Sequence, residues 1–274
     1  MLFRSDIEPI ASGIEPLIAA LGDDSNAAAE AIMTTDLAKK EIAFAFDLGG
    51  KTCHIGGIAK GSGMIQPNMA TMLGFITTDA AISPAMLQQA LSADILDSFN
   101  MVSVDGDTST NDMVTLLANG MAGNAPITSE GADYEAFRAA LSAVTHTLSR
   151  SIAADGEGAT KLVEVQVSGA ASSEDAYKIV LAVAKSPLVK TAFFGEDANW
   201  GRILTAAGYS GADFDPAGCD IFLGDLKVCE KGCALLFDEV LAKQILQHKD
   251  ILIRIELSEG RASDRMWTCD FSYD

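Results

Sequence analysis

The chain alternates between stretches with a helical spacing of apolar residues and shorter apolar runs typical of strands. Apolar positions three and four residues apart predict a long amphipathic helix over 132–154. Gly49-Gly50 separates two loosely alternating runs and predicts a β-hairpin turn. The predicted helices are 8–21, 26–33, 84–94, 112–121, 132–154, 173–185, 203–207 and 237–247. The predicted strands are 41–48, 52–58, 72–76, 99–104, 163–167, 188–194, 220–223, 226–229, 250–257 and 265–272.

Helices and strands follow one another irregularly, and several neighbouring strands are close enough in sequence to form hairpins. This order indicates an α/β protein whose mixed sheets are covered by helices, rather than a strict repeat of parallel strand and helix. No linker, internal repeat or low-complexity tract divides the 274 residues. The chain is long enough for one large domain or two small ones.

Composition narrows the class of protein. Hydrophobic residues make up 49% of the chain and charged residues 21%, as in ordinary globular proteins. The net charge of −19 argues against binding to nucleic acid or to an anionic membrane, since both need a basic surface. No run of about 18 apolar residues predicts a membrane span, and the N-terminus has no signal-peptide core. We expect a cytoplasmic protein.

Metal and cofactor sites are not expected. Five cysteines without a compact framework are most simply reduced thiols in a cytoplasmic chain. Cys229 and Cys233 lack a second pair or a histidine at zinc spacing. The acidic loop that starts at Asp105 fails the calcium-loop pattern, because Thr110 and Leu116 stand where glycine and glutamate are needed.

One stretch, residues 56–73, carries candidate chemistry. Four glycines surround Lys60, and Thr71 then directly precedes an apolar run that predicts a buried strand. A strand end is a rigid mount for a reactive hydroxyl. The plainer interpretation is an ordinary turn with a solvated lysine, and the pattern alone favours that interpretation.

Four motifs change this balance: Met33-Thr34-Thr35-Asp36, the stretch from Lys60 to Leu73 with its Ala-Thr-Met-Leu ending, the 104–112 loop, and Gly156–Lys161. In this order they resemble the ornithine acetyltransferase (glutamate N-acetyltransferase) family of arginine biosynthesis. The resemblance implies two mixed sheets layered between helices. It also implies that the chain cuts itself between Ala70 and Thr71, giving residues 1–70 as one subunit and 71–274 as the other, with Thr71 as N-terminal nucleophile.

The resemblance implies further site residues. Thr34, Lys60 and Glu157 match positions that bind substrate in the family, although Thr35 leaves the register of the first one open. The 104–112 loop would shape the pocket floor; the alternative is that its side chains only cap the predicted helix after it. Glu196 and Asp197 compete with Glu157 as acidic candidates, and we assign them a structural role, capping the helix that begins near Trp200.

The chemistry of a threonine nucleophile explains why cleavage would be needed. His54, His146 and His248 are scattered, so no histidine is credibly placed as base. A terminal threonine can use its own α-amine, but that amine exists only after the preceding bond is cut. The resemblance implies that N-acetylornithine donates an acetyl group to glutamate, that acetyl-CoA is a possible second donor, and that cleaved chains assemble as α₂β₂.

Two departures from the family qualify this expectation. Members carry a further N-terminal region whose Ser-Thr-Gly segment forms the oxyanion hole, and a C-terminal tail with substrate-binding Asn and Thr; this sequence shows neither. Loss of one oxyanion donor typically costs ~100–1000-fold in rate, so we expect this chain alone to be nearly inactive. The alternatives are a related self-cleaving amidohydrolase or aminopeptidase, and an inactive truncated homologue.

Overall fold

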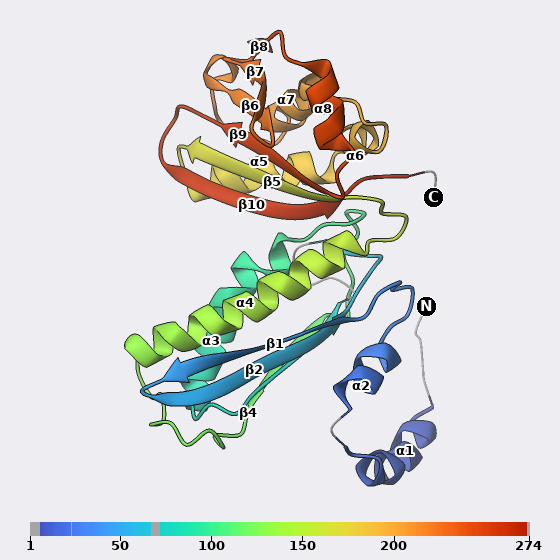
Figure 1. Ribbon diagram of the computed structural model, residues 1–274, viewed down its shortest axis with the longest axis vertical. Coiled ribbons are helices and arrows are strands. Elements are labelled where there is room, and N and C mark those ends of the chain that lie inside the picture. Colours follow the sequence, from blue (N-terminus) through green and yellow to red (C-terminus); the bar gives the residue numbers. More distant parts are fainter. Residues whose placement is uncertain (1–5, 23, 67–71, 273–274) are drawn as a thin grey trace.

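The computed structural model describes residues 6–22, 24–66 and 72–272, which form two mixed β-sheets stacked along the long axis of the molecule (Figure 1). The first sheet has the order β1-β2-β3-β4 and the second has the order β10-β5-β9-β6-β7-β8. Each sheet contains parallel and antiparallel pairs. The predicted α/β class with mixed sheets is therefore confirmed.

The first sheet comprises β1 (Lys40–Leu48), β2 (Lys51–Lys60), β3 (Leu73–Thr78) and β4 (Met113–Ala118). The helices of this half are α1 (Glu8–Ala19), α2 (Ser25–Ala31), α3 (Pro84–Asp97) and α4 (Ala132–Ala154), with a 3-10 turn at Phe99–Met101. The second sheet comprises β5 (Leu162–Ala170), β6 (Asp220–Leu223), β7 (Leu226–Glu230), β8 (Cys233–Ala234), β9 (Asp250–Glu256) and β10 (Ala262–Cys269). Its helices are α5 (Ser173–Lys185), α6 (Pro187–Phe194), α7 (Trp200–Gly208) and α8 (Glu239–Leu246), with a 3-10 turn at Pro216–Gly218.

The β1–β2 hairpin confirms the predicted turn. Gly49 and Gly50 have φ values of 58° and 82°. A two-residue turn with positive φ at both positions matches the right-handed twist of the strands, and glycine adopts it without steric cost. The antiparallel register then runs from Leu48↔Lys51 to Lys40↔Ala59.

The strand register brings three distant segments to one end of the first sheet. β2 pairs antiparallel with β3, with Lys60 opposite Leu73. β3 pairs parallel with β4, with Leu73 opposite Met113. The end of β2 and the beginnings of β3 and β4 therefore lie next to one another, and this edge carries the candidate site.

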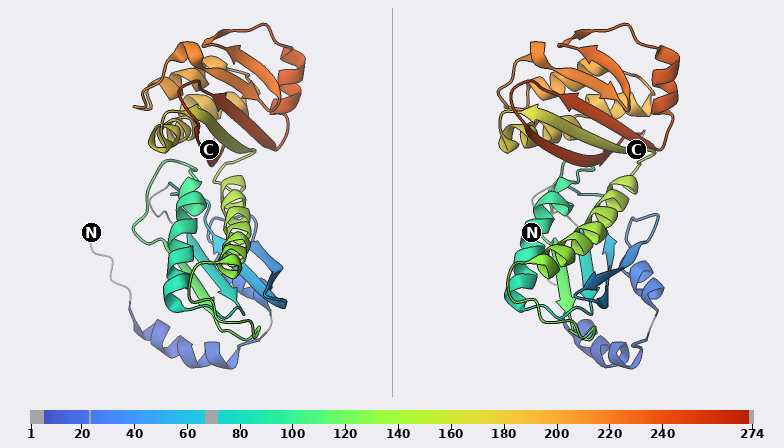
Figure 2. Two further views of the ribbon diagram at one scale, coloured as in Figure 1. Left: turned by 90° about the vertical axis from the view of Figure 1, so that its left-hand side faces the viewer. Right: turned by 60° about the vertical axis from the view of Figure 1, so that its left-hand side comes forward.

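The core of the first half lies between its sheet and α4. The buried face of α4 includes Phe137, Leu141, Val144 and Leu148, at the helical spacing seen in the sequence. Glycine on the sheet lets α4 pack closely, because a Cβ at Gly57 would lie 3.1 Å from Val144 Cγ1 and would crowd the helix. Figure 2 shows α3 beside α4 and the C-terminal end of α4 leading into the second sheet.

Three of the predicted elements are wrong. Residues 99–104 form a 3-10 turn and an isolated bridge between Val102 and Trp267 instead of a strand. Residues 113–118 form β4 instead of part of a helix, because pairing with β3 overrides local helix propensity. Residues 187–194 form α6 instead of a strand, with Ser186 as N-cap and Pro187 in the first turn. The two-residue strand β8 was not predicted.

Candidate active site

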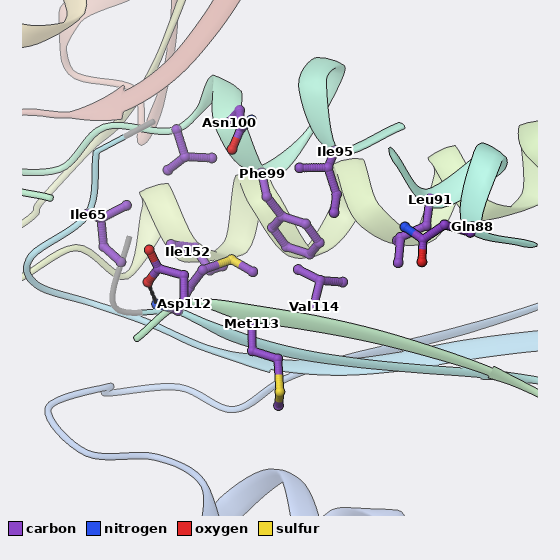
Figure 3. Close-up of a pocket in the computed structure, with 12 residues that line it drawn as sticks. Ile65, Gln88, Leu91, Ile95, Phe99, Asn100, Asp112, Met113, Val114 and Ile152 are labelled. Atoms are coloured by element: carbon purple, nitrogen blue, oxygen red, sulfur yellow. Dashed lines mark hydrogen bonds between the residues drawn. The ribbon is translucent and has the colours of Figure 1, made fainter. Parts of the chain in front are cut away.

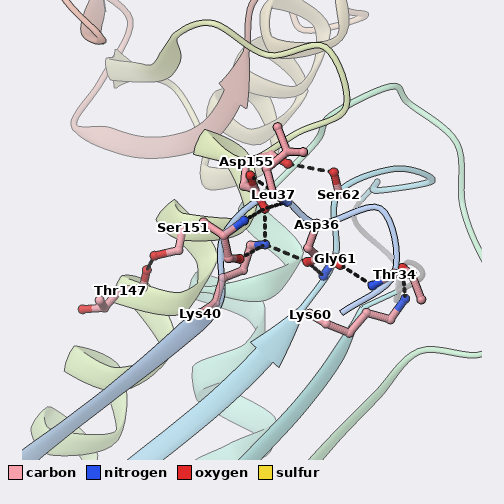
Figure 4. Close-up of polar contacts among 11 residues, drawn as sticks. Thr34, Asp36, Leu37, Lys40, Lys60, Gly61, Ser62, Thr147, Ser151 and Asp155 are labelled. Carbon is pink, nitrogen blue, oxygen red and sulfur yellow. Dashed lines mark hydrogen bonds and ion pairs between the residues drawn. The ribbon is translucent and has the colours of Figure 1, made fainter. Parts of the chain in front are cut away.

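Lys60 and Thr34 lie next to each other. Lys60 ends β2 and is only 9% exposed, and its Nζ donates to Thr34 Oγ1 at 3.4 Å (Figure 4). Thr34, rather than its neighbour Thr35, therefore faces this lysine. In the described part of the chain, no carboxylate lies within ion-pair distance of the Lys60 ammonium. A buried ammonium with only a hydroxyl partner is suited to receive an anionic ligand.

Glu157 lies against the same glycine-rich loop. Its backbone N–H donates to the carbonyl oxygen of Ser62 at 2.9 Å. A Cβ on Gly63 would come within 2.5 Å of Glu157 Cδ, so the carboxyl group lies directly against this glycine and would have to move if residue 63 were larger. The structure thus brings the predicted substrate-binding residues Thr34, Lys60 and Glu157 to one loop from three separate segments.

Ala70 and Thr71, the predicted cleavage site and nucleophile, lie outside the described residues. The residue that follows them, Met72, is buried and held on both sides of its backbone. Its N–H donates to Asp112 Oδ1 at 3.1 Å, and its carbonyl accepts the N–H of Met113 at 3.2 Å. The roles of Ala70 and Thr71 remain predictions.

The 104–112 loop holds both flanks of the predicted cleavage segment. Asp105 accepts the N–H groups of Met64 at 2.5 Å and of Ile65 at 3.1 Å. Asp112, at the other end of the loop, accepts the N–H of Met72. No helix follows this loop, so the suggestion that it caps one is wrong. Sequence reasoning did not assign Asp105 or Asp112 individually; their motif was the only signal.

Asp112 combines a hydrogen-bonded oxygen with an unpartnered one. Oδ2 is buried and has no hydrogen-bond partner among the described residues. Burial raises the pKa of the Asp112 carboxyl, while the hydrogen bond from Met72 and the positive charge of Lys60 act in the opposite direction. The positive charge of Lys60 therefore favours the ionised form of Asp112, the residue that accepts the backbone N–H of Met72.

An apolar cavity of about 170 Å³ adjoins this carboxyl (Figure 3). It lies between α3, α4 and β4. Its apolar walls are formed by Ile65, Met72, Leu91, Ile95, Phe99, Val102, Met113, Val114 and Ile152. Asp112 is the one acidic residue among the described residues of the lining, with Asn100 and Gln88 as the uncharged polar ones. Such walls keep water from the carboxyl and favour its neutral form.

Glu196 and Asp197 lie elsewhere, and the prediction that they cap α7 is wrong. Asn199 is the N-cap, and its Oδ1 accepts the N–H of Arg202 at 3.2 Å. Asp197 instead orients this cap by accepting Asn199 Nδ2 at 3.0 Å. Glu196 accepts Gln247 Nε2 at 3.2 Å.

His54 and His146 contact residues that lie away from the candidate site. His54 Nδ1 lies 2.8 Å from Asp79 Oδ2, and His146 contacts Ser142 and Arg265. Within the described residues, no group of three or more His, Cys, Asp or Glu side chains could hold a metal ion. Among the helices of the same residues, none has the length and apolarity needed to cross a membrane.

Comparison with known proteins identifies the family. The model of the ArgJ family matches residues 3–274. The arginine biosynthesis bifunctional protein ArgJ of Symbiobacterium thermophilum is 53% identical over 269 residues, covering 98% of this chain and 67% of that protein. The protein of the same name from Thermotoga neapolitana is 49% identical over 270 residues, covering 97% of this chain and 68% of the relative. The chain thus spans about two thirds of the length of these relatives.

The fold agrees with a solved structure. The crystal structure of arginine biosynthesis bifunctional protein argJ from Bacillus halodurans is 43% identical and superposes with a TM-score of 0.71. The match covers 73% of this chain and 94% of that one. Sequence and fold together show that this chain belongs to the ArgJ family, the glutamate N-acetyltransferase family of arginine biosynthesis that its four motifs predicted.

Proposed function

We propose that this chain is a self-cleaving acetyltransferase that moves an acetyl group from N-acetylornithine to glutamate through an ester on Thr71. The observation that carries the proposal is the pairing of Lys60 with Thr34 at the end of β2, in register with Leu73. Lys60 is thus a buried cation without a carboxylate partner among the described residues. It lies on β2, next to β3, and β3 begins two residues after Thr71. This placement suits a site for a substrate with a free carboxylate.

Maturation proceeds by an acyl shift in this proposal. The Thr71 hydroxyl oxygen attacks the Ala70 carbonyl carbon, and the C–N bond between the two residues breaks. The nitrogen leaves as the α-amine of Thr71 and takes up the hydroxyl proton. Water then hydrolyses the ester, releasing the carboxylate of Ala70 and freeing the hydroxyl of Thr71.

Acetyl transfer then uses the same hydroxyl twice. The α-amine of Thr71 accepts the hydroxyl proton as the oxygen attacks the acetyl carbonyl carbon of N-acetylornithine. The amide C–N bond breaks, ornithine leaves with that proton on its amine, and an acetyl ester remains on Thr71. The amine of glutamate attacks this ester, and N-acetylglutamate departs as the hydroxyl is restored.

N-acetylornithine is held by opposite charges at its two ends. Lys60 binds the carboxylate, and Thr34 orients the ammonium of Lys60 through the 3.4 Å hydrogen bond. Glu157 is exposed beside Gly63, so its carboxylate is accessible to the side-chain ammonium of N-acetylornithine. Ornithine and glutamate share the α-amino-acid group, which explains why one site can serve donor and acceptor.

The two cleavage products stay together in this proposal. Cleavage before Thr71 places β1 and β2 in the product 1–70 and β3 and β4 in the product 71–274. These two halves share the β2–β3 ladder, which runs from Lys60↔Leu73 to Ile55↔Thr78. We also propose, from the family resemblance, α₂β₂ assembly and the use of acetyl-CoA as a second donor.

Intact-mass measurement with N-terminal sequencing tests the proposal. The wild-type chain should give two fragments, one beginning Thr71-Met72-Leu73, whereas Thr71→Ala should remain a single chain of 28.7 kDa. Cleaved protein should form N-acetylglutamate from N-acetylornithine and glutamate at a slow but detectable rate. Release of free acetate without glutamate dependence would indicate an amidohydrolase instead. A wild-type chain that stays uncut would contradict the proposal.

A further inference from the structure

A buried cluster of charges lies next to the candidate site (Figure 4). Lys40, at the start of β1, is 3% exposed, and Asp36, four residues before it, is 7% exposed. The Lys40 ammonium donates to Asp36 Oδ1 at 2.7 Å and to Asp155 Oδ2 at 2.6 Å. Asp155 follows the last residue of α4. We call these three residues the Asp36–Lys40–Asp155 cluster.

The Asp36 carboxylate ties two substrate-binding segments together. Oδ1 accepts the N–H of Gly61 at 2.8 Å, and Gly61 is the residue after Lys60. Oδ2 accepts the N–H of Thr34 at 3.1 Å. A single carboxylate therefore fixes the backbone at Thr34 and directly after Lys60.

Asp155 extends the same arrangement to the third segment. Its carboxylate accepts the N–H groups of Leu37 at 3.0 Å and of Ala38 at 3.3 Å. Its backbone carbonyl accepts the hydroxyl of Ser62 at 2.8 Å. Ser62 in turn accepts the N–H of Glu157 at 2.9 Å.

Buried charges strongly prefer one arrangement. An unpaired buried carboxylate or ammonium is costly, so a cluster in which each group is paired and hydrogen-bonded tolerates little displacement. Burial alone would raise the pKa of the Asp36 carboxyl, but hydrogen bonds from Gly61, Lys40 and Thr34 outweigh it and lower that pKa. Asp36 is therefore an anion at neutral pH, with both oxygens engaged.

We propose that Asp36 and Asp155, bridged by Lys40, are positioning residues that set the geometry of Thr34, Lys60 and Glu157. This inference rests on the proposed function, since it assigns a purpose to the site described there. Thr34 and Lys60 are separated by 26 residues, and Glu157 belongs to a third segment. Apart from the cluster, the described hydrogen bonds that join these segments at the site are the one from Lys60 to Thr34 and the one from Glu157 to Ser62, and neither involves a carboxylate.

If the cluster only stabilised the fold, removing one of its carboxylates would lower stability without moving Lys60. The test therefore compares the loss of Asp36 with the loss of a carboxylate that has similar hydrogen bonds but lies away from the site. Asp36→Asn removes the buried anion next to the site. Asp220→Asn is the matched control, because Asp220 accepts the Lys227 ammonium at 2.8 Å and the Lys231 N–H at 2.7 Å in the second half of the molecule. Both variants are made in the full 274-residue chain.

Chemical labelling reports the position of Lys60 independently of activity. The folded proteins are treated briefly with acetic anhydride, and modification of Lys60 is quantified by mass spectrometry relative to exposed Lys51. We expect labelling of Lys60 to rise about tenfold in Asp36→Asn, the size of one lost charge-assisted hydrogen bond, and to stay unchanged in Asp220→Asn. Unchanged labelling of Lys60 in folded Asp36→Asn would overturn the proposal.

Steady-state kinetics separate positioning from general destabilisation. In the active enzyme, Asp36→Asn should raise KM for glutamate about tenfold with a much smaller change in kcat. Equal losses in kcat in Asp36→Asn and Asp220→Asn would overturn the proposal. If Asp36→Asn does not fold, Asp155→Asn takes its place: it removes one of the two carboxylates that hold the Lys40 ammonium, while Asp36 keeps its bonds to Thr34 and Gly61, so a smaller displacement of Lys60 is expected. Labelling of Lys60 should then rise about threefold, and no rise would overturn the proposal.

The two hypotheses can fail separately. A wild-type chain that stays uncut and forms no N-acetylglutamate contradicts the proposed function. The labelling experiment still decides the positioning claim in that case, because it measures where Lys60 lies and needs no turnover.

Discussion

At the scale of single residues, the site depends on ionisable side chains that are partly or fully buried. Lys60 is a buried cation that contacts a hydroxyl, and Asp112 is a carboxyl with one buried oxygen that has no partner among the described residues. The two side chains differ in whether they are free to bind a substrate. Lys60 can gain a partner when an anionic substrate binds, whereas Asp112 is already committed through one oxygen to the backbone of Met72.

Replacing Lys60 should weaken substrate binding. Lys60→Met removes the cation and keeps most of the side-chain volume, so KM for glutamate should rise about 10- to 100-fold through loss of a charge-assisted hydrogen bond. Steady-state kinetics on the cleaved enzyme measure this rise. Lys51→Met, at an exposed position of the β1–β2 hairpin, is the control. A KM unchanged in Lys60→Met would show that substrate carboxylates bind elsewhere.

Asp112 and Asp36 should respond to pH with opposite signs. The raised pKa of Asp112 means that the folded chain binds more protons than the unfolded chain above pH 3.8, so its contribution to stability falls as pH rises through that window. The lowered pKa of Asp36 means that its contribution is present above pH 3.8 and is lost as pH falls through the folded-state pKa.

Thermal unfolding at about pH 3 and about pH 7 tests these signs. The Tm of Asp112→Asn relative to wild type should become more favourable at the higher pH, because the variant avoids burying a charge. The relative Tm of Asp36→Asn should become less favourable over the same interval. Parallel shifts in the two variants would contradict the assignment.

At the scale of elements, most of the fold could be predicted where the pattern was long or the turn chemistry specific. The period of α4 over 23 residues and the Gly49-Gly50 hairpin were both confirmed. The elements that were predicted wrongly are short apolar runs. Residues 113–118 fit a helix locally but pair with β3, and 188–194 fit a strand although Ser186 and Pro187 begin a helix there. Runs of this length carry too little periodicity to decide.

Helix α4 should contribute far more than α1 to the free energy of unfolding. Phe137 of α4 is fully buried and stacks at a tilt near Phe46 of β1, so Phe137→Ala should cost about 3–5 kcal/mol. Leu17 of α1 is 70% exposed, so Leu17→Ala should change stability by less than about 0.5 kcal/mol. Denaturant unfolding of both variants measures the difference. A comparable loss in Leu17→Ala would mean that α1 packs in solution.

At the scale of the whole molecule, the proposed cleavage would divide one sheet between two chains. The hydrogen bonds of the β2–β3 ladder and the packing of α4 on β1 and β2 both cross that division. A cut backbone leaves these contacts in place, since none of them depends on the bond between Ala70 and Thr71.

The cleaved products should therefore remain associated. Size-exclusion chromatography under native conditions should give one peak containing both fragments, and the fragments should separate only in denaturant. Uncleaved Thr71→Ala provides the reference elution volume. Separate native peaks would contradict the proposed division between residues 1–70 and 71–274.

The sequence alone determined the family, the α/β class and the candidate residues Thr34, Lys60 and Glu157, because motifs, composition and long periodic patterns are local properties of the chain. Only the tertiary structure placed Lys60 against Thr34, brought Glu157 to the same loop, and showed that Asp36 and Asp112 hold the surrounding backbone. These contacts join residues far apart in sequence, and they exist because strand register and burial fix which distant segments meet.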